Sequence, residues 1–283
     1  MRRITSSLVA RVNKTKTFGL ACLLGLSLAA AAQEQTDGLA ILKKVQDTYT
    51  SMKTFQAEGR LVSTLSSPTV LIGGGRLSPQ TSETAFAIAM AQPDKLRVEN
   101  KDAEKGSLKI LHGKTLWIYT PKLNKYSEAD VSTPSGARAK AGALEDFDSF
   151  RGNYKKLLEG VKSAKVLREE SLRVDGRDVG CYVLRVEWKG GGKPVTKSGT
   201  TFEVDPAETI WIDKSRFLVL KKDSRRMKST TSGPLGMQFD FETTVYFEKA
   251  AVDEPVTGEL FNFVPPAGAT RIVRTQSRSK PRQ

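Results

Sequence analysis

The sequence predicts an α+β fold in which amphipathic helices cover the concave face of one curled antiparallel β-sheet. Short segments with alternating apolar residues follow one another along most of the chain, and turn residues separate them. No crossover helix fits between consecutive segments, which favours an antiparallel meander over βαβ units. A sheet of roughly ten such strands is expected to curl, and two helices then have only its concave side on which to bury their apolar stripes.

The first 32 residues have the pattern of a secretory signal peptide, so we expect them to be absent from the mature protein. Five basic residues precede a 15-residue apolar run, Phe18 to Ala32, which is too short for a comfortable membrane span. The run ends in Ala30-Ala31-Ala32, a small-residue site that predicts cleavage before Gln33. Cys22 lies inside the run and not after it, so lipid attachment is not expected there.

The net charge of +14 is concentrated at the two ends of the chain. The leader carries five of the positive charges, and residues 271–283 carry five more without an acidic residue. We therefore expect no nucleic-acid partner and interpret residues 271–283 as a basic, disordered tail, with loose attraction to anionic lipid head groups as the alternative. The predicted domain, residues 33–270, contains one cysteine, Cys181, and so has no internal disulfide.

The mature chain is expected to begin with an amphipathic helix and to continue as strands. The helix is predicted by apolar residues at helical spacing, namely Leu39, Leu42, Val45, Tyr49 and Met52. The period then changes to two, which predicts strands at Gln56–Leu65, Glu83–Ala91, Lys95–Asn100 and Ser107–Leu111. Gly113 turns the chain into an aromatic strand that ends at Tyr119. Residues 121–142 are polar, contain Pro and Gly, and predict a loop.

A second helical element and further strands are expected in the remaining chain. Apolar residues from Leu144 to Val161 recur at helical spacing, with an interruption near Gly152. Strands are predicted at Ala164–Arg173, Val179–Lys189, Glu208–Asp213, Phe217–Met227 and Met237–Lys249. The glycines at 190–192 are followed by Lys193 and Pro194, where a phosphate-binding loop needs Ser or Thr, and so they predict a flexible hairpin end.

The residue types that support most catalytic sites are scarce. His112 is the single histidine, so neither a histidine-based triad nor a multi-histidine metal site can be assembled. The neighbouring carboxylates Glu169 and Glu170, and Asp146 with Asp148, lie among basic residues and are interpreted as solvated. Cys181, on an alternating strand, is expected to be buried and unreactive. We therefore expect a protein that is not an enzyme and has neither a metal nor a cofactor.

Two segments resemble the outer-membrane lipoprotein carrier (LolA-like) family of the bacterial periplasm. They are Gly113-Lys-Thr-Leu-Trp-Ile-Tyr-Thr-Pro121 and Leu260-Phe-Asn-Phe-Val-Pro-Pro-Ala-Gly268, and the order of the surrounding elements is also similar. Trp211-Ile212-Asp213 with Leu218 to Lys221 is similar to the penultimate hairpin of that family. One position departs from the pattern, because the best-known carriers have an arginine before the strand-start proline and this chain has Gln92.

The resemblance implies an unclosed β-barrel with helices over its mouth and a cavity for the acyl chains of lipoproteins or other lipids. It implies a soluble, monomeric periplasmic carrier that meets a membrane-bound donor or acceptor protein. An envelope lipid or lipoprotein sensor that regulates a membrane signalling partner is the alternative. In either case the cavity would shield acyl chains, since each buried methylene contributes about 0.8 kcal/mol.

The predicted cavity wall consists of apolar residues on alternating strand positions. A filled core is as good an interpretation as a cavity for any one of them, because periodicity identifies apolar faces without showing what covers them. The candidates are Phe86, Ile88, Met90, Leu96, Val98, Ile110, Trp117, Tyr182, Leu184, Val186, Trp188, Phe239 and Phe241.

Overall fold

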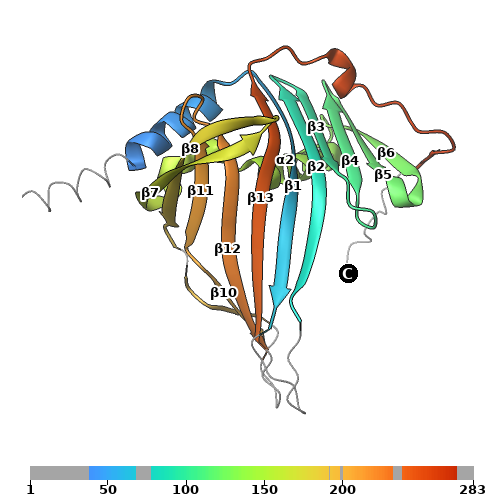
Figure 1. Cartoon of the computed structure of the whole chain (residues 1–283). Coiled ribbons are helices and arrows are strands. Elements are labelled where there is room, and N and C mark those ends of the chain that lie inside the picture. Colours follow the sequence, from blue (N-terminus) through green and yellow to red (C-terminus); the bar gives the residue numbers. More distant parts are fainter. Residues whose placement is uncertain (1–37, 68–77, 191, 198–199, 232–237, 273–283) are drawn as a thin grey trace, which may run out of the picture.

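The computed structural model describes residues 38–67, 78–190, 192–197, 200–231 and 238–272. Within them, 14 strands form one sheet, with a main path in the order β14-β6-β5-β4-β3-β2-β1-β13-β12-β11-β8-β7 (Figure 1). The two ends of this path do not pair with each other in the described part of the chain. The α+β fold with an unclosed barrel is therefore confirmed. The predicted leader and residues 273–283 lie outside the described residues.

The first half of the chain forms a meander whose strands pair in sequence order. Its members are β1 (Thr54–Ser66), β2 (Gln80–Ala91), β3 (Lys95–Asn100), β4 (Ser107–His112), β5 (Thr115–Thr120) and β6 (Lys125–Asp130). The second half adds β7 (Val161–Val174), β8 (Arg177–Trp188), β9 (Val195–Lys197), β10 (Thr200–Val204), β11 (Ala207–Asp213), β12 (Val219–Thr231) and β13 (Gln238–Val252). The short β14 (Thr270–Arg271) pairs in parallel with β6, whereas the other described pairs are antiparallel.

Three α-helices accompany the sheet in the described part of the chain. The N-terminal helix covers residues 38–51 and buries Leu42, Val45 and Tyr49 completely, whereas Leu39 is 38% exposed. Helix α2 (Pro134–Arg151) begins at an N-cap, Thr133, whose side-chain oxygen accepts a hydrogen bond from the Gly136 N–H. The 3₁₀ turn η2 (Tyr154–Lys156) and the short α3 (Leu157–Gly160) follow. None of the described helices is long and apolar enough to span a membrane.

The prediction of a loop at residues 121–142 is wrong. This stretch contains the 3₁₀ turn η1 (Pro121–Leu123), all of β6 and the first half of α2. Three of the six residues of strand β6 are charged, namely Lys125, Glu128 and Asp130, and the strand lies near the sheet edge, so it lacks an apolar pattern. Two short strands that the sequence did not predict, β9 and β10, follow the predicted hairpin end at residues 190–194.

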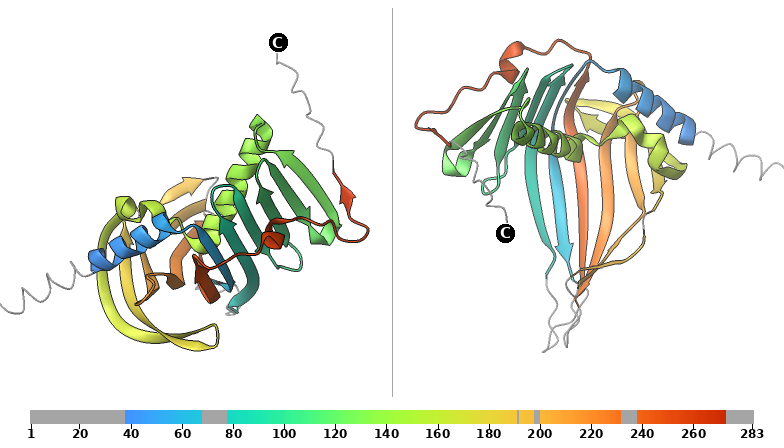
Figure 2. Two further views of the ribbon diagram at one scale, coloured as in Figure 1. Left: turned by 90° about the horizontal axis from the view of Figure 1, so that it is seen from above. Right: turned by 180° about the vertical axis from the view of Figure 1, so that it is seen from behind.

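Helix α2 crosses one face of the sheet near one end of its long strands (Figure 2). We call this the inner face. The inner side chain of Lys109 forms an ion pair with Asp146 of α2, and the Phe147 ring meets Phe55 of β1 at 6.3 Å. Strands β1, β2, β12 and β13 continue well past the helix, and no described helix covers their far ends (Figure 2, right). We call this far part of the four strands the uncovered half of the inner face.

The outer face is covered at two places by the chain itself. The β7–β8 hairpin curls back over the sheet, and the Asp175 N–H at its tip donates a hydrogen bond to the Glu248 carbonyl of β13. Residues 253–269, which we call the C-terminal strap, run across β3 and β4. The strap inserts Phe261 into a small second core with Ala89 and Ile110. Both apolar faces of the middle strands are therefore buried.

Candidate functional site

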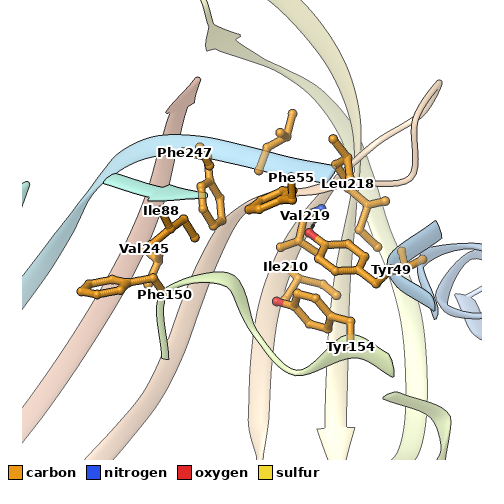
Figure 3. Close-up of a cluster of buried hydrophobic side chains, with 14 of the residues drawn as sticks. Tyr49, Phe55, Ile88, Phe150, Tyr154, Ile210, Leu218, Val219, Val245 and Phe247 are labelled. Carbon is orange, nitrogen blue, oxygen red and sulfur yellow. Dashed lines mark hydrogen bonds between the residues drawn. The ribbon is translucent and has the colours of Figure 1, made fainter. Parts of the chain in front are cut away.

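Most of the predicted cavity residues lie in a filled core beneath the helices. The seven that are buried there, each at most 8% exposed, are Phe86, Ile88, Met90, Leu96, Val98, Leu184 and Val186. Tyr182 and Trp188 are partly buried at the margin of the same cluster. Figure 3 shows rings from the helices and the sheet in contact across this region, among them Tyr49, Phe55 and Tyr154.

Phe86 shows how tightly this region is packed. Its ring stacks on Phe150 of α2 at 4.5 Å and meets the Phe247 edge at 5.7 Å. Gly59 lies directly beneath it, since a Cβ at that position would overlap both the Phe86 ring and the Tyr246 carbonyl. The absence of a side chain at Gly59 is what lets the ring lie flat against β1.

Ile110 and Trp117 lie on the other face of the sheet. Val98 belongs to the inner core and pairs with Lys109, so the next residue along β4, Ile110, points outward. Both residues are covered by the C-terminal strap, where the Trp117 ring stacks on Phe263 at 6.3 Å. They therefore cannot share a cavity with the residues of the inner core.

Phe239 and Phe241 lie on the uncovered half of the inner face. The register of β1 with β13 pairs Leu65 with Phe241 and Leu61 with Val245, and Val245 is the last fully buried member of this row. Leu61, Phe239 and Phe241 are half-buried, and Leu65 is 38% exposed. We call Leu61, Leu65, Phe239 and Phe241 the distal trough.

Hydroxyl side chains border the distal trough. Ser63 lies between Leu61 and Leu65 on the same side of β1, and β2 places Ser82 and Thr84 opposite Ser63 and Leu61. At the far end a pocket of about 230 Å³ is lined by Leu65, Phe239, Gln80 and three serines. On the side of β1 and β2 the surface thus offers apolar residues with uncharged polar neighbours, a lining that suits an aliphatic chain. On the side of β12, Lys222 pairs with Val245 on the same face, at the inner end of the trough.

Two other clefts have a different character. A cleft of about 750 Å³ on the outer face lies between the β7–β8 hairpin tip and the turn after β11, and charged residues such as Glu58, Lys249 and Asp178 line it. A groove of about 450 Å³ separates the N-terminal helix from β7. Among the described residues, no group of three or more His, Cys, Asp or Glu is arranged to hold a metal ion.

Two buried tyrosines lie between the N-terminal helix and α2, with their rings 4.8 Å apart. Burial raises the pKa of Tyr49 to about 12, although the Val219 N–H donates a hydrogen bond to its hydroxyl. Burial also raises the pKa of Tyr154, and the nearby Tyr49 and Glu208 raise this pKa further. Burial raises the pKa of Cys181 to about 11, so this thiol stays protonated and unreactive at neutral pH.

Gln92, where the sequence departs from the carrier pattern, still connects the sheet to a helix. Its side-chain amide donates a hydrogen bond of 2.8 Å to the Met52 carbonyl just after the N-terminal helix. Its backbone N–H donates to the Lys53 carbonyl. The glutamine therefore fixes the end of this helix through an uncharged contact.

No protein-family model matches this chain. An uncharacterized protein of Methanocaldococcus jannaschii is 24% identical over 250 residues, which cover 87% of this chain. The same alignment covers 57% of that protein, so the chain spans little more than half of the relative's length.

Several solved structures have a distantly similar fold. The lipoprotein LppX of Mycobacterium tuberculosis matches with 12% identity over 78% of this chain and 98% of its own, at a TM-score of 0.39. A LolA superfamily protein of Nitrosomonas europaea matches with 12% identity over 80% of this chain and 97% of its own, at a TM-score of 0.24. A chain of the Pseudomonas aeruginosa MucA/MucB complex matches with 15% identity over 81% of this chain and 61% of its own, at a TM-score of 0.38. These scores describe a divergent likeness, and the strand order above defines the fold class.

Proposed function

We propose that this protein is a non-catalytic carrier that binds the acyl chain of a lipid or lipoprotein in the distal trough. The observation that supports this proposal most strongly is the uncovered apolar floor formed by Leu61, Leu65, Phe239 and Phe241. Leu65 pairs with Phe241, and the Ser63–Thr243 pair lies between them and Leu61. Exposed apolar surface on a folded domain is typical of a binding site. An acyl chain laid on this floor would leave water along most of its length, at about 0.8 kcal/mol for each methylene that becomes buried.

The division of the inner face explains how one sheet can both be stable and bind a ligand. The half beneath the helices is filled by side chains such as Phe86 and Phe150 and stabilises the fold. The other half has the same alternation, but none of the described helices lies above it. We propose that residues 33–270 form this binding domain, that the leader directs it to the periplasm, and that a membrane-bound protein supplies or receives the cargo.

A pair of charge substitutions on one strand tests this proposal. Leu65 faces the trough, whereas Val62 faces the other side of β1, opposite Thr244. We expect L65E to weaken binding of the fluorescent fatty acid cis-parinaric acid by tenfold or more, because the introduced side-chain carboxylate would lose its hydration beneath the bound acyl chain. We expect V62E to bind it like the unmodified protein.

The measurement is a fluorescence titration of purified mature protein, combined with circular dichroism to show that both variants are folded. Failure of the unmodified protein to bind the probe would contradict the proposal. Equal weakening by L65E and V62E would place the ligand elsewhere.

A further inference from the structure

The last residue of α2 is an arginine with unmet hydrogen-bonding capacity inside the protein. The Arg151 side chain is 4% exposed, and its Nη2 donates to Asp148 Oδ1 at 2.8 Å. Its Nε and Nη1 atoms have no hydrogen-bond partner among the described residues. The guanidinium lies over the rings of Phe147, at 4.9 Å, and Tyr49, at 5.6 Å. A buried cation with two unpaired nitrogens is expensive to maintain, because aromatic faces replace only part of its lost hydration.

A second buried polar side chain, Tyr154, lacks a hydrogen-bond partner among the described residues and forms a cluster with Arg151 and Tyr49. The Tyr154 hydroxyl is buried and has no hydrogen-bond partner in the described part of the chain. Its ring packs edge-on against Tyr49, the ring that Arg151 covers. Tyr49 differs, because its own hydroxyl accepts a hydrogen bond from Val219. Three unpaired polar atoms therefore belong to two residues that both contact the Tyr49 ring.

Phe150, the residue before Arg151, connects this cluster to the inner end of the distal trough. Arg151 follows Phe150, whose ring stacks on Phe86 over Gly59. The next inward-facing residue of β1 is Leu61, the first residue of the trough. Figure 3 shows Phe150 and Tyr154 along the same side of the packed rings. Between them the chain turns at Gly152, whose φ of 92° is one that residues with a side chain rarely adopt.

We infer that Arg151 and Tyr154 bind the anionic head group, a carboxylate or a phosphate ester, of an amphiphile whose acyl chain occupies the distal trough. This inference rests on the function proposed above and names the ligand class. The Arg151 nitrogens would supply charge-assisted hydrogen bonds and the Tyr154 hydroxyl a third donor. Because these atoms are covered in the unliganded protein, the segment from Arg151 to Tyr154 moves aside at the Gly152 turn when the head group enters, while Phe150 stays against Phe86.

The test compares ligands that share a chain and differ in the head group. Hexadecanoic acid, its methyl ester and a hexadecanoyl glycerol phosphate are each titrated into mature protein by calorimetry. We expect both acids to bind at least about tenfold more tightly than the ester, as for hydrogen bonds to a charged group. The tighter of the two acids identifies a carboxylate or a phosphate as the preferred head.

Two variants separate recognition from stability. R151M is expected to bind acids and ester alike, at the affinity that the unmodified protein has for the ester. Y154F removes only the unpaired hydroxyl, so it keeps the fold if R151M does not, and it is expected to lower acid affinity several-fold without changing ester affinity.

Equal affinity of the unmodified protein for acid and ester would overturn the inference while leaving the carrier function in place. A preference for acids that persists in both variants would overturn it as well. Absence of binding to all three ligands would instead contradict the carrier function itself.

Discussion

Replacing Phe86 with alanine is expected to lower the free energy of unfolding by about 3–5 kcal/mol, the loss typical of a buried aromatic ring in a filled core. Phe86 is 1% exposed and contacts the rings of both Phe150 and Phe247. The variant would leave a cavity between α2 and β1 that the stiff sheet cannot close. Urea unfolding followed by tryptophan fluorescence measures this change.

Phe241 provides the matched control for this prediction. It is the same residue type on the same face, but it is half-buried in the distal trough. F241A is expected to lose only about 1–2 kcal/mol, because less apolar surface returns to water. Similar losses for F86A and F241A would mean that the space around Phe86 is as open as the trough, which is the cavity that the sequence resemblance implied.

Replacing Asp213 with alanine is expected to cost about 2–4 kcal/mol at neutral pH, since several hydrogen bonds to a charged group are lost together. The Asp213 carboxylate is 1% exposed and accepts hydrogen bonds from the Ser215 N–H, the Ser215 hydroxyl and Arg216. Arg216 also donates to the Ala250 carbonyl of β13, and its own carbonyl accepts from Thr48 of the N-terminal helix. Asp213 thus holds the turn after β11 in the conformation in which it contacts both the N-terminal helix and β13.

The loss in D213A is expected to depend on pH. Burial alone would raise the pKa of Asp213, but the hydrogen bonds from Ser215 and Arg216 outweigh it and hold the pKa below its usual range. A lowered pKa in the folded state stabilises the protein above the unfolded-state value of about 4 and loses this effect as the pH falls through the folded value.

Chemical unfolding of both proteins at pH 7 and near pH 3 measures this effect. The difference in free energy should shrink at the lower pH. A difference that stays constant would show that the charge of Asp213 contributes nothing. D213N, which keeps the shape and loses the charge, should lie between the two proteins at pH 7.

The fold was predictable where one face of an element is apolar and the other polar. The N-terminal helix and strands such as β1 and β13 have this pattern, and their positions follow from it. Strand β6 and the start of α2 do not, since half of the residues of β6 are charged and α2 begins with small residues. A usable signal was nevertheless present there, because Thr133 followed by Pro134 is a typical helix start.

The candidate site was harder to predict, because alternation shows which residues share a face and not what lies over it. Phe86 and Phe241 have equivalent patterns, yet α2 covers the first, whereas no described helix covers the far end of β13, which carries the second. Ile110 was assigned to the wrong face of the sheet since the C-terminal strap, far along the chain, buries its side. Arg151 was missed, although it follows Phe147 by four residues and so falls on the apolar stripe of α2.

The pairing of the long strands makes the two borders of the distal trough unequal. On one side β12 is flanked by β10, which pairs with it from Val204 to Thr200. On the other side β3 pairs with β2 only from Phe86 onward, so the stretch of β2 from Gln80 to Thr84 has a described partner on one side only. Under the proposed function, an acyl chain would therefore enter sideways across β2 without breaking any described strand pair, and loading and release would not pass through the end of the barrel.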